Sequence, residues 1–291
     1  YKRQLHAHGQ TNRANEFQAH DGVTTALELE WGVAFLGDWL ERRSGNAMLN
    51  FGATVQHPFA RWMVMEKYAD QVERAQQKVI SEGISLRAQA EARKSFYEPL
   101  TQEEQKKLPA RLMEGLQQGG LGIGVPVNYY PGATREEVFR VYQFAAEQDV
   151  PVYSHVRALN LAAVQEAIAN AAVTGASLHL NHINSVARKD IGTALEMVAS
   201  ARENGLDITA EMYPYTAGST GLESAIFNEG WQERLGISYG DLQWVATGER
   251  LTQDTFKRYR ASGGTVILHF MKQEWIDLGM PVSYTHLTLP T

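Results

Sequence analysis

Short apolar runs alternate with amphipathic segments through the middle of the chain. The runs at 121–128, 150–156, 177–183 and 206–215 are strand candidates at regular spacing. The segments between them repeat apolar residues every three to four positions, which is the period of a helix with one buried face. Strands that alternate with helices in this way predict parallel βα units.

Signals for helix ends support this pattern. Thr134 and Glu137 form a capping-box pattern at the start of one helix. A second helix is expected from about 161 to 172, and a third ends before Gly205, a natural C-terminal stop. The segments between the strand candidates therefore read as complete crossover helices.

The first part of the chain adds three strand candidates. These are LHAH at 5–8, VTTALELE at 23–30 and AMLNFGATV at 47–55, while GTVILHF at 264–270 is a further candidate downstream. Residues suited to catalysis or ligand binding stand at the C-terminal ends of many successive strands. This favours an α/β fold with a TIM-like (β/α)8 barrel over a doubly wound sheet, whose site concentrates at one switch point. We predict a barrel that is incomplete at its C-terminal end.

Residues 58–118 are charged and helix-like, and they predict a helical insertion after strand three. Thr101 and Glu104 form a second capping-box pattern. Pro109 predicts a break or restart in the helix, and Gly119 predicts a stop.

Composition narrows the class of protein. The 291 residues are 44% hydrophobic and 21% charged, with a net charge of -6, which argues against a nucleic-acid or anionic-membrane partner. No apolar run approaches the roughly 20 residues that span a bilayer. The sequence has no cysteine, so a metal site must use histidines and carboxylates, and a cytoplasmic location is expected. No glycine-rich nucleotide-binding motif is present.

The two ends differ from the rest in character. YKRQ at 1–4 and VSYTHLTLPT at 282–291 resemble translated sequencing-adapter read-through, and we expect both ends to be non-native. We expect the barrel fragment to occupy 5–280.

Four histidines stand at strand ends that a barrel would bring to one mouth. His6 and His8 share a face because side chains two apart in a strand point the same way, and His155 and His182 close two later strands. A single strand-end histidine is more often a hydrogen-bonded loop residue. Four that converge predict a zinc site with one or two ions.

The other histidines are expected to lie elsewhere. His20 precedes a strand, His179 is expected to pack outward, and His57 is expected beside the ligands without binding metal. His269 is expected in the core or next to the ligands.

Six segments, in order, resemble the N-acyl-D-amino-acid deacylases (D-aminoacylases) of the amidohydrolase superfamily. They span about 5–222 and are LHAHGQ, GVTTALELEWG, GLGIGVPVNYYPG, VYSHVR, LNHINSVA and ITAEMYPYTAGSTG. The resemblance implies an amidohydrolase-type barrel that binds zinc through His6, His8, His155 and His182. It also implies hydrolysis of the linear amide bond of N-acyl-D-amino acids by attack of a metal-bound hydroxide.

The sequence departs from the family's pattern at the bridging ligand. Trp31 stands where the family has a cysteine, and 121–128 contain no lysine that carboxylation could turn into a bridge. Glu28 and Glu30 are the acidic candidates on one strand face, and Glu30 is favoured because it is nearer the mouth. Buried carboxylates there would be costly unless paired with a cation.

A second departure concerns the proton carrier. The family places a catalytic Asp at the end of strand eight in an SDG-like segment, and none follows HFMKQEWIDLGM. The catalytic residue is therefore unknown and is expected beyond the chain, so that 264–270 would be the strand before it. We expect little or no turnover from these 291 residues.

The resemblance also implies substrate-binding residues. Tyr129, Tyr213 and Ser219 would hold the oxyanion or the substrate carboxylate, and Arg157 could form two parallel bonds to a carboxylate. Alternatively, the tyrosines only pack, Ser219 only shapes a turn and Arg157 pairs with a nearby acid.

Two other functions stay open at this stage. A cyclic-amide hydrolase of the dihydroorotase or hydantoinase type would share the histidines, and the fragment could be an inactive, non-catalytic barrel. The expected partner is a small N-acyl amino acid, without nucleic acid or membrane. Side-chain and acyl specificity, metal number and oligomeric state are not determined by the sequence.

Overall fold

The computed structural model describes residues 4–6, 12–82 and 92–286. The chain divides into two compact units. The first comprises Tyr1–His155 and Asn170–His179, and the second comprises Val156–Ala169 and Leu180–Thr291.

A seven-stranded sheet holds the strands predicted from the sequence, in the order β1-β2-β3-β4-β5-β6-β7. The strands are β1 (Gln4–His6), β2 (Thr25–Val33), β3 (Asn50–Gln56), β4 (Ile123–Pro126), β5 (Val152–His155), β6 (Leu178–Leu180) and β7 (Ile208–Ala210). Each neighbouring pair from β1 to β5 is parallel, as predicted. Within the described residues no pairing of β7 with β1 closes the sheet into a barrel.

Helices follow most of the strands. They are α1 (Asn12–His20), α2 (Leu36–Arg43), α3 (His57–Val64), α4 (Ala69–Glu82), α6 (Gln102–Gln117), α7 (Arg135–Glu147), α8 (Leu161–Thr174), α9 (Ile183–Ala187), α10 (Ile191–Glu203), α11 (Trp231–Leu235), α12 (Gln253–Ser262) and α13 (Gln273–His286). Short 3-10 helices include η1 (Glu66–Tyr68), η2 (Arg93–Tyr97) and η3 (Val127–Tyr129). In the described ranges no helix combines the length and apolar character needed to cross a membrane.

The core of the first unit lies between the sheet and α7. Val138, Val141, Tyr142 and Ala145 of α7 are buried, which confirms the helical period read from the sequence. Ile123 and Val125 of β4 and Val152 of β5 have no exposed surface, as expected for strands of a sheet covered on both faces.

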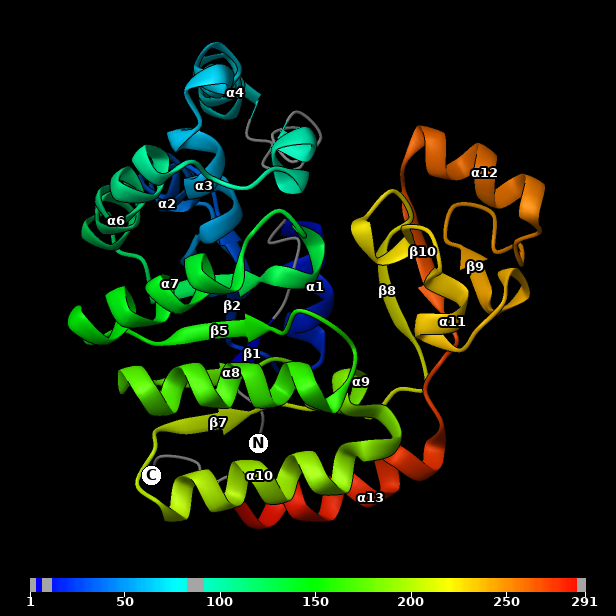
Figure 1. The fold of residues 1–291 in the computed structure, drawn as a ribbon. Coiled ribbons are helices and arrows are strands. Elements are labelled where there is room, and N and C mark those ends of the chain that lie inside the picture. The colour runs from blue at the N-terminus through cyan, green and yellow to red at the C-terminus, as the bar shows by residue number, and fades with distance from the viewer. Residues whose placement is uncertain (1–3, 7–11, 83–91, 287–291) are drawn as a thin grey trace. The chain divides into compact units, whose positions relative to one another are not determined.

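The insertion after β3 is helical, as predicted, and comprises α3, η1, α4, η2 and α6 (Figure 1). Thr101 and Glu104 form a reciprocal capping box at the start of α6. The expected break at Pro109 was wrong, because α6 continues through this residue. Leu108 and Leu112 flank it and are almost fully buried, so packing of that face sustains the helix despite the missing N–H.

A second sheet was not anticipated. The strands β8 (Gly218–Gly221), β9 (Leu242–Trp244) and β10 (Thr265–Leu268) form an antiparallel sheet in the order β8-β10-β9. The expectation that 264–270 form a barrel strand was therefore wrong. Val266 and Leu268 are buried and alternate with more exposed residues, a period typical of an antiparallel strand with one covered face.

A break in the register of β2 places Glu30. The pairing of β2 with β3 shifts between Glu28 and Val33, and Gly32 adopts φ 71° in this stretch. A Cβ on Gly124 of β4 would lie 2.5 Å from the backbone oxygen of Glu30. Thr54 of β3 donates a 2.7 Å hydrogen bond to the backbone oxygen of Leu29. The irregular segment is therefore held by backbone contacts that leave no room for a side chain at Gly124.

We expect Gly124→Ala to lower the free energy of unfolding by about 1–3 kcal/mol, because the added methyl group overpacks a rigid backbone contact. Urea denaturation measures the change. Gly192→Ala is the matched control, since its Cβ would meet only Leu278 at 3.5 Å. Equal stability of the two variants would contradict the proposed contact.

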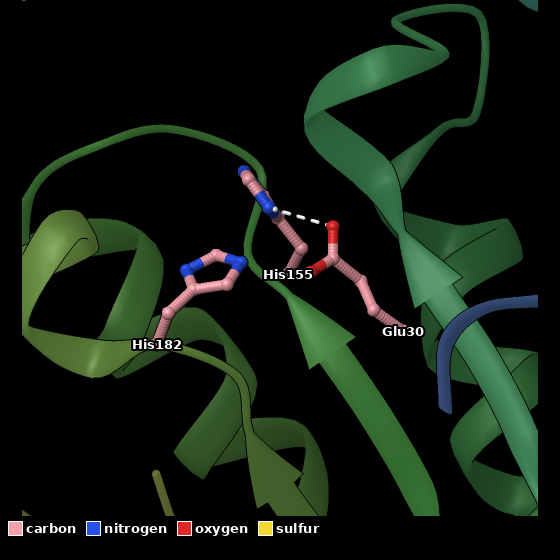
Figure 2. Close-up of side chains that lie close together, drawn as sticks. All are labelled: Glu30, His155 and His182. Atoms are coloured by element: carbon pink, nitrogen blue, oxygen red, sulfur yellow. Dashed lines mark hydrogen bonds and ion pairs between the residues drawn. The ribbon is translucent and has the colours of Figure 1, made fainter. Parts of the chain in front are cut away.

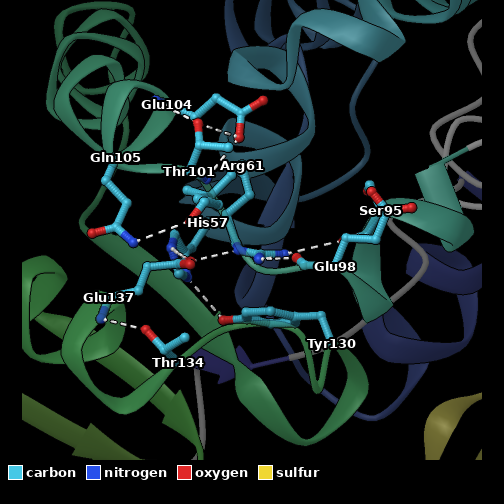
Figure 3. Close-up of polar contacts among 11 residues, drawn as sticks. His57, Arg61, Ser95, Glu98, Thr101, Glu104, Gln105, Tyr130, Thr134 and Glu137 are labelled. Carbon is cyan, nitrogen blue, oxygen red and sulfur yellow. Dashed lines mark hydrogen bonds and ion pairs between the residues drawn. The ribbon is translucent and has the colours of Figure 1, made fainter.

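Four buried polar side chains join α3 to α7 and to the segment after β4 (Figure 3). Arg61 Nε donates to Glu137 Oε1 at 2.5 Å, His57 Nε2 lies 3.2 Å from the same oxygen, and His57 Nδ1 lies 2.9 Å from the Tyr130 hydroxyl. Each of the four is at most 1% exposed. We call His57, Arg61, Tyr130 and Glu137 the His57 cluster.

The His57 cluster has perturbed protonation equilibria. Burial lowers the pKa of His57, and the Arg61 charge lowers it further, although Glu137 opposes both. Burial alone would raise the pKa of Glu137, but His57 and Arg61 outweigh it and the pKa lies below its ordinary value. Both groups therefore bind protons less readily in the folded protein than in the unfolded chain.

Stability is expected to decrease as the pH falls below about 6.5, the ordinary pKa of histidine. Unfolded His57 takes up a proton that the folded protein rejects, which costs at most about 1.4 kcal/mol per pH unit. Glu137 adds a loss of the same sign below about 4.5. Urea denaturation from pH 7.5 to 5 measures the slope.

His57→Asn should flatten this slope between pH 7 and 5. His269, whose pKa is also lowered by burial, contributes with the same sign, so His269→Asn serves as the comparison. An unchanged slope in His57→Asn would show that His57 does not titrate differently on unfolding.

Candidate metal centre

Glu30 and His155 form a buried pair. Glu30 lies in the irregular segment of β2, and His155 is the last residue of β5. His155 Nδ1 is 3.1 Å from Glu30 Oε1, and the two residues are 4% and 2% exposed, respectively. A carboxylate so deeply buried is costly without a positive or hydrogen-bonding partner. The pairing supports the expectation that a buried Glu30 would need one.

His182 precedes α9 with a left-handed backbone, at φ 33° and ψ 54°. Non-glycine residues rarely adopt this conformation, and it is often found at functional sites. Ser185 Oγ donates to the His182 backbone oxygen at 3.0 Å and lies 3.0 Å from His182 Nδ1. With its proton used, the Ser185 hydroxyl accepts from Nδ1–H, which places the lone pair of the ring on Nε2.

Glu30, His155 and His182 offer ligand atoms that lie within 4.8 Å of one another. Figure 2 shows the three side chains together, with the contact between His155 and Glu30 marked. Two imidazoles and a carboxylate are ordinary zinc ligands, and three protein ligands are typical of catalytic zinc sites. In a tetrahedral zinc site, ligand atoms at about 2.0–2.1 Å from the metal stand about 3.4 Å apart. The donor set fits zinc by the chemistry of its ligand atoms.

The other predicted ligands are His6, His8 and Glu28. His6 lies in β1 and pairs with Leu27 of β2, while His8 falls outside the described residues. Glu28 is buried two residues before Glu30, and its backbone oxygen accepts a 3.5 Å bond from Thr54. His6, His8 and Glu28 stay predictions as ligands.

Tyr129 is the substrate-binding candidate that contacts a member of the group. Its ring centroid is 5.0 Å from that of His155 in an edge-on arrangement, and 5.0 Å from that of Trp31. The sequence singled out Trp31 only as the residue in place of a cysteine. An aromatic residue directly after Glu30 was the available signal for this contact.

The other three substrate-binding candidates have their own surroundings. Arg157 Nε donates to both carboxylate oxygens of Glu166 on α8, at 2.9 and 3.2 Å. The backbone oxygen of Tyr213 accepts a 2.8 Å hydrogen bond from Asn184 Nδ2, and Ser219 lies on β8 in register with Ile267. Their role in substrate binding stays a prediction.

The remaining histidines have separate contacts. His57 lies in the His57 cluster, and His20 lies in the last turn of α1. The His179 ring lies 5.4 Å from that of Tyr153, and His269 Nε2 lies 2.9 Å from Gln243 Oε1. None of them joins the group of potential ligands found among the described residues.

Comparison with known proteins gives two kinds of likeness. No family model matches the chain. The N-acyl-D-glutamate deacylase of Alcaligenes xylosoxydans xylosoxydans is 29% identical over 127 residues, which are 40% of this chain and 26% of that protein. The chain therefore matches about a quarter of this curated relative.

Solved structures share the fold. The N-acyl-D-glutamate deacylase of Bordetella bronchiseptica, complexed with zinc and a phosphonate mimic of the tetrahedral intermediate, has a TM-score of 0.68 at 19% identity. The likeness covers 93% of this chain and 60% of that one. A D-aminoacylase structure, described as defining a novel subset of amidohydrolases, has a TM-score of 0.64 at 16% identity and covers 90% of this chain and 57% of its own.

At these identities the structural likeness shows the fold, which is that of the amidohydrolase barrel enzymes. The curated relative adds a likeness in sequence to the same group of deacylases. Sequence and fold together support the resemblance of this chain to the D-aminoacylase family of the amidohydrolase superfamily.

Proposed function

We propose that Glu30, His155 and His182 bind zinc, and that the protein hydrolyses the linear amide bond of N-acyl-D-amino acids. The observation that carries this proposal is the meeting of two imidazoles and a buried carboxylate from segments far apart in the sequence. The likeness to N-acyl-D-glutamate deacylases and D-aminoacylases supports the choice of reaction. A second ion, held with His6 and His8, is part of the proposal.

Bound zinc would supply Lewis-acid polarisation of the substrate carbonyl. The chain's own residues would set up that chemistry. Glu30 would hold His155 by the contact at Nδ1 and contribute its negative charge, while Ser185 would hold His182 with Nε2 as the ligand atom. In this arrangement both imidazoles are oriented before the metal binds.

Tyr129 is the best supported residue for contact with the substrate, because its ring packs against His155. Its hydroxyl would donate to the oxygen on which negative charge develops. Arg157 would hold a substrate carboxylate through its terminal N–H groups while Nε stays on Glu166. Tyr213 and Ser219 would complete the binding of that carboxylate.

Zinc binding tests the first part of the proposal. We expect the 291-residue protein to bind zinc, and His155→Ala and His182→Ala each to weaken binding by more than about tenfold, because losing even the groups that orient ligands costs 10–100-fold. Isothermal titration calorimetry with zinc chloride after chelator treatment measures the affinity. His269→Ala, outside the group, is the matched control. Equal affinity in all four proteins would reject the assignment.

Ligand binding tests the second part of the proposal, the choice of substrate. Binding can be measured without the proton carrier that catalysis needs. We expect the zinc-loaded protein to bind a phosphonate analogue of an N-acyl-D-amino acid roughly tenfold or more tightly than its L enantiomer. Calorimetry with both enantiomers and with a hydantoin makes the comparison. Tighter binding of the hydantoin would favour a cyclic-amide hydrolase. Zinc binding without any ligand binding would favour a non-catalytic barrel.

A further inference from the structure

The His57 cluster reaches the candidate metal centre through two adjacent tyrosines. Tyr130 is fully buried and its hydroxyl lies 2.9 Å from His57 Nδ1. Tyr129, the residue before it, places its ring 5.0 Å from that of His155. The peptide unit between them therefore joins the His57 cluster to a proposed metal ligand.

The protonation pattern of the His57 cluster gives the contact with Tyr130 a direction. Burial lowers the pKa of His57, so its ring is neutral near pH 7 and carries one N–H. Glu137 Oε1, an acceptor bound by Arg61, lies 3.2 Å from Nε2, and its negative charge favours the proton there. His57 Nδ1 is then the acceptor, and Tyr130 donates its O–H to it.

Backbone hydrogen bonds hold the rest of the segment after β4 in place. Gly132 N donates to the Phe96 backbone oxygen at 2.8 Å, and Ala133 N donates to the Tyr130 backbone oxygen at 3.0 Å. A Cβ on Gly132 would lie 2.4 Å from Glu98 N, so the two backbones touch. The segment that holds both tyrosines therefore packs against η2 and the residue that follows it.

Arg61 fixes that part of the insertion from the other side. Its terminal nitrogens donate to the backbone oxygens of Glu98 at 2.8 Å and Ser95 at 3.4 Å (Figure 3). Phe96, which lies between these two residues, has its ring 6.3 Å from both Trp31 and Tyr130. The rings of Phe96, Tyr129, Tyr130 and Trp31 thus form a connected set of contacts that reaches His155.

We propose that His57, acting through Tyr130, is a positioning residue that fixes Tyr129 against His155. In this proposal His57 and Tyr130 act through Tyr129 and not as ligands. Their effect is to limit the positions of the Tyr129 ring, and so those of the His155 imidazole against which it packs. The proposal rests on the proposed function only in taking His155 as a zinc ligand.

Tyr130→Phe is the test variant, because it removes the donated O–H and keeps the ring. Tyr142→Phe is the matched control, a buried tyrosine on α7 outside the His57 cluster. We expect Tyr130→Phe to weaken zinc binding roughly threefold to tenfold and to shift the visible absorption bands of the cobalt-loaded protein, since groups that orient ligands tune both. Tyr142→Phe should do neither.

His57→Asn and His57→Leu separate positioning from general stability. The Asn side chain places its carbonyl oxygen near the Nδ1 position and can accept from Tyr130, whereas Leu cannot. We expect His57→Asn to keep the zinc affinity within about twofold of that of the unmodified protein. His57→Leu should weaken zinc binding as much as Tyr130→Phe does. Equal zinc affinity and equal cobalt spectra for Tyr130→Phe and Tyr142→Phe would overturn the proposal.

A readout without metal keeps the two proposals distinguishable. The contribution of Trp31 to the near-ultraviolet circular dichroism is the part of the spectrum that is lost in Trp31→Phe. Because Tyr129 packs on Trp31, displacement of Tyr129 should change this contribution. We expect this signal to fall in Tyr130→Phe and to persist in Tyr142→Phe. If the unmodified protein binds no zinc, the zinc assignment fails, and the Trp31 signal still decides whether Tyr130 positions Tyr129.

Discussion

The carboxylate of Glu30 lies inside a parallel sheet, where an unpaired negative charge would be expensive to keep. Nδ1 of His155 meets it at 3.1 Å, and this contact ties the end of β5 to the irregular part of β2. Much of the local backbone follows from the need to make that contact. The register shift in β2, the glycine at position 124 and the hydrogen bond from Thr54 all serve to place one acidic side chain at one point.

The same cost of burial is met differently in the His57 cluster. Glu137 is also buried, but a permanent cation, Arg61, lies against it, and His57 stays neutral beside it. In this group the guanidinium of Arg61 balances the negative charge. Glu30 with two imidazoles is instead a set of donors that a divalent cation would suit. The contrast explains why the buried His57 does not belong with the ligands.

Local pattern was enough to predict the seven strands, the helices between them and the caps at Thr101 and Thr134. Strand-end position pointed to His155 and His182, and the departure from the family's pattern pointed to Glu30. The structure brings these three side chains together, and their role as ligands stays a prediction. The antiparallel sheet was missed because β8, with the sequence GSTG, has no apolar residue and so no hydrophobic period, and its partner β10 lies in a distant segment. Pro109 was misread because propensity outweighed burial in the prediction, whereas burial decides the outcome in the protein.

The start of α7 shows how a sequence motif can serve two neighbours at once. Thr134 accepts from the Glu137 backbone N–H, as a capping box requires, but the Glu137 carboxylate does not return to the cap. It reaches Arg61 on α3 instead. Glu137→Asp, a substitution that could be chosen to strengthen this helix end alone, would move the carboxylate away from Arg61. Arg61 has no exposed surface, so water could not replace the carboxylate. Engineering for thermal robustness would therefore have to treat α3 and α7 as a single element.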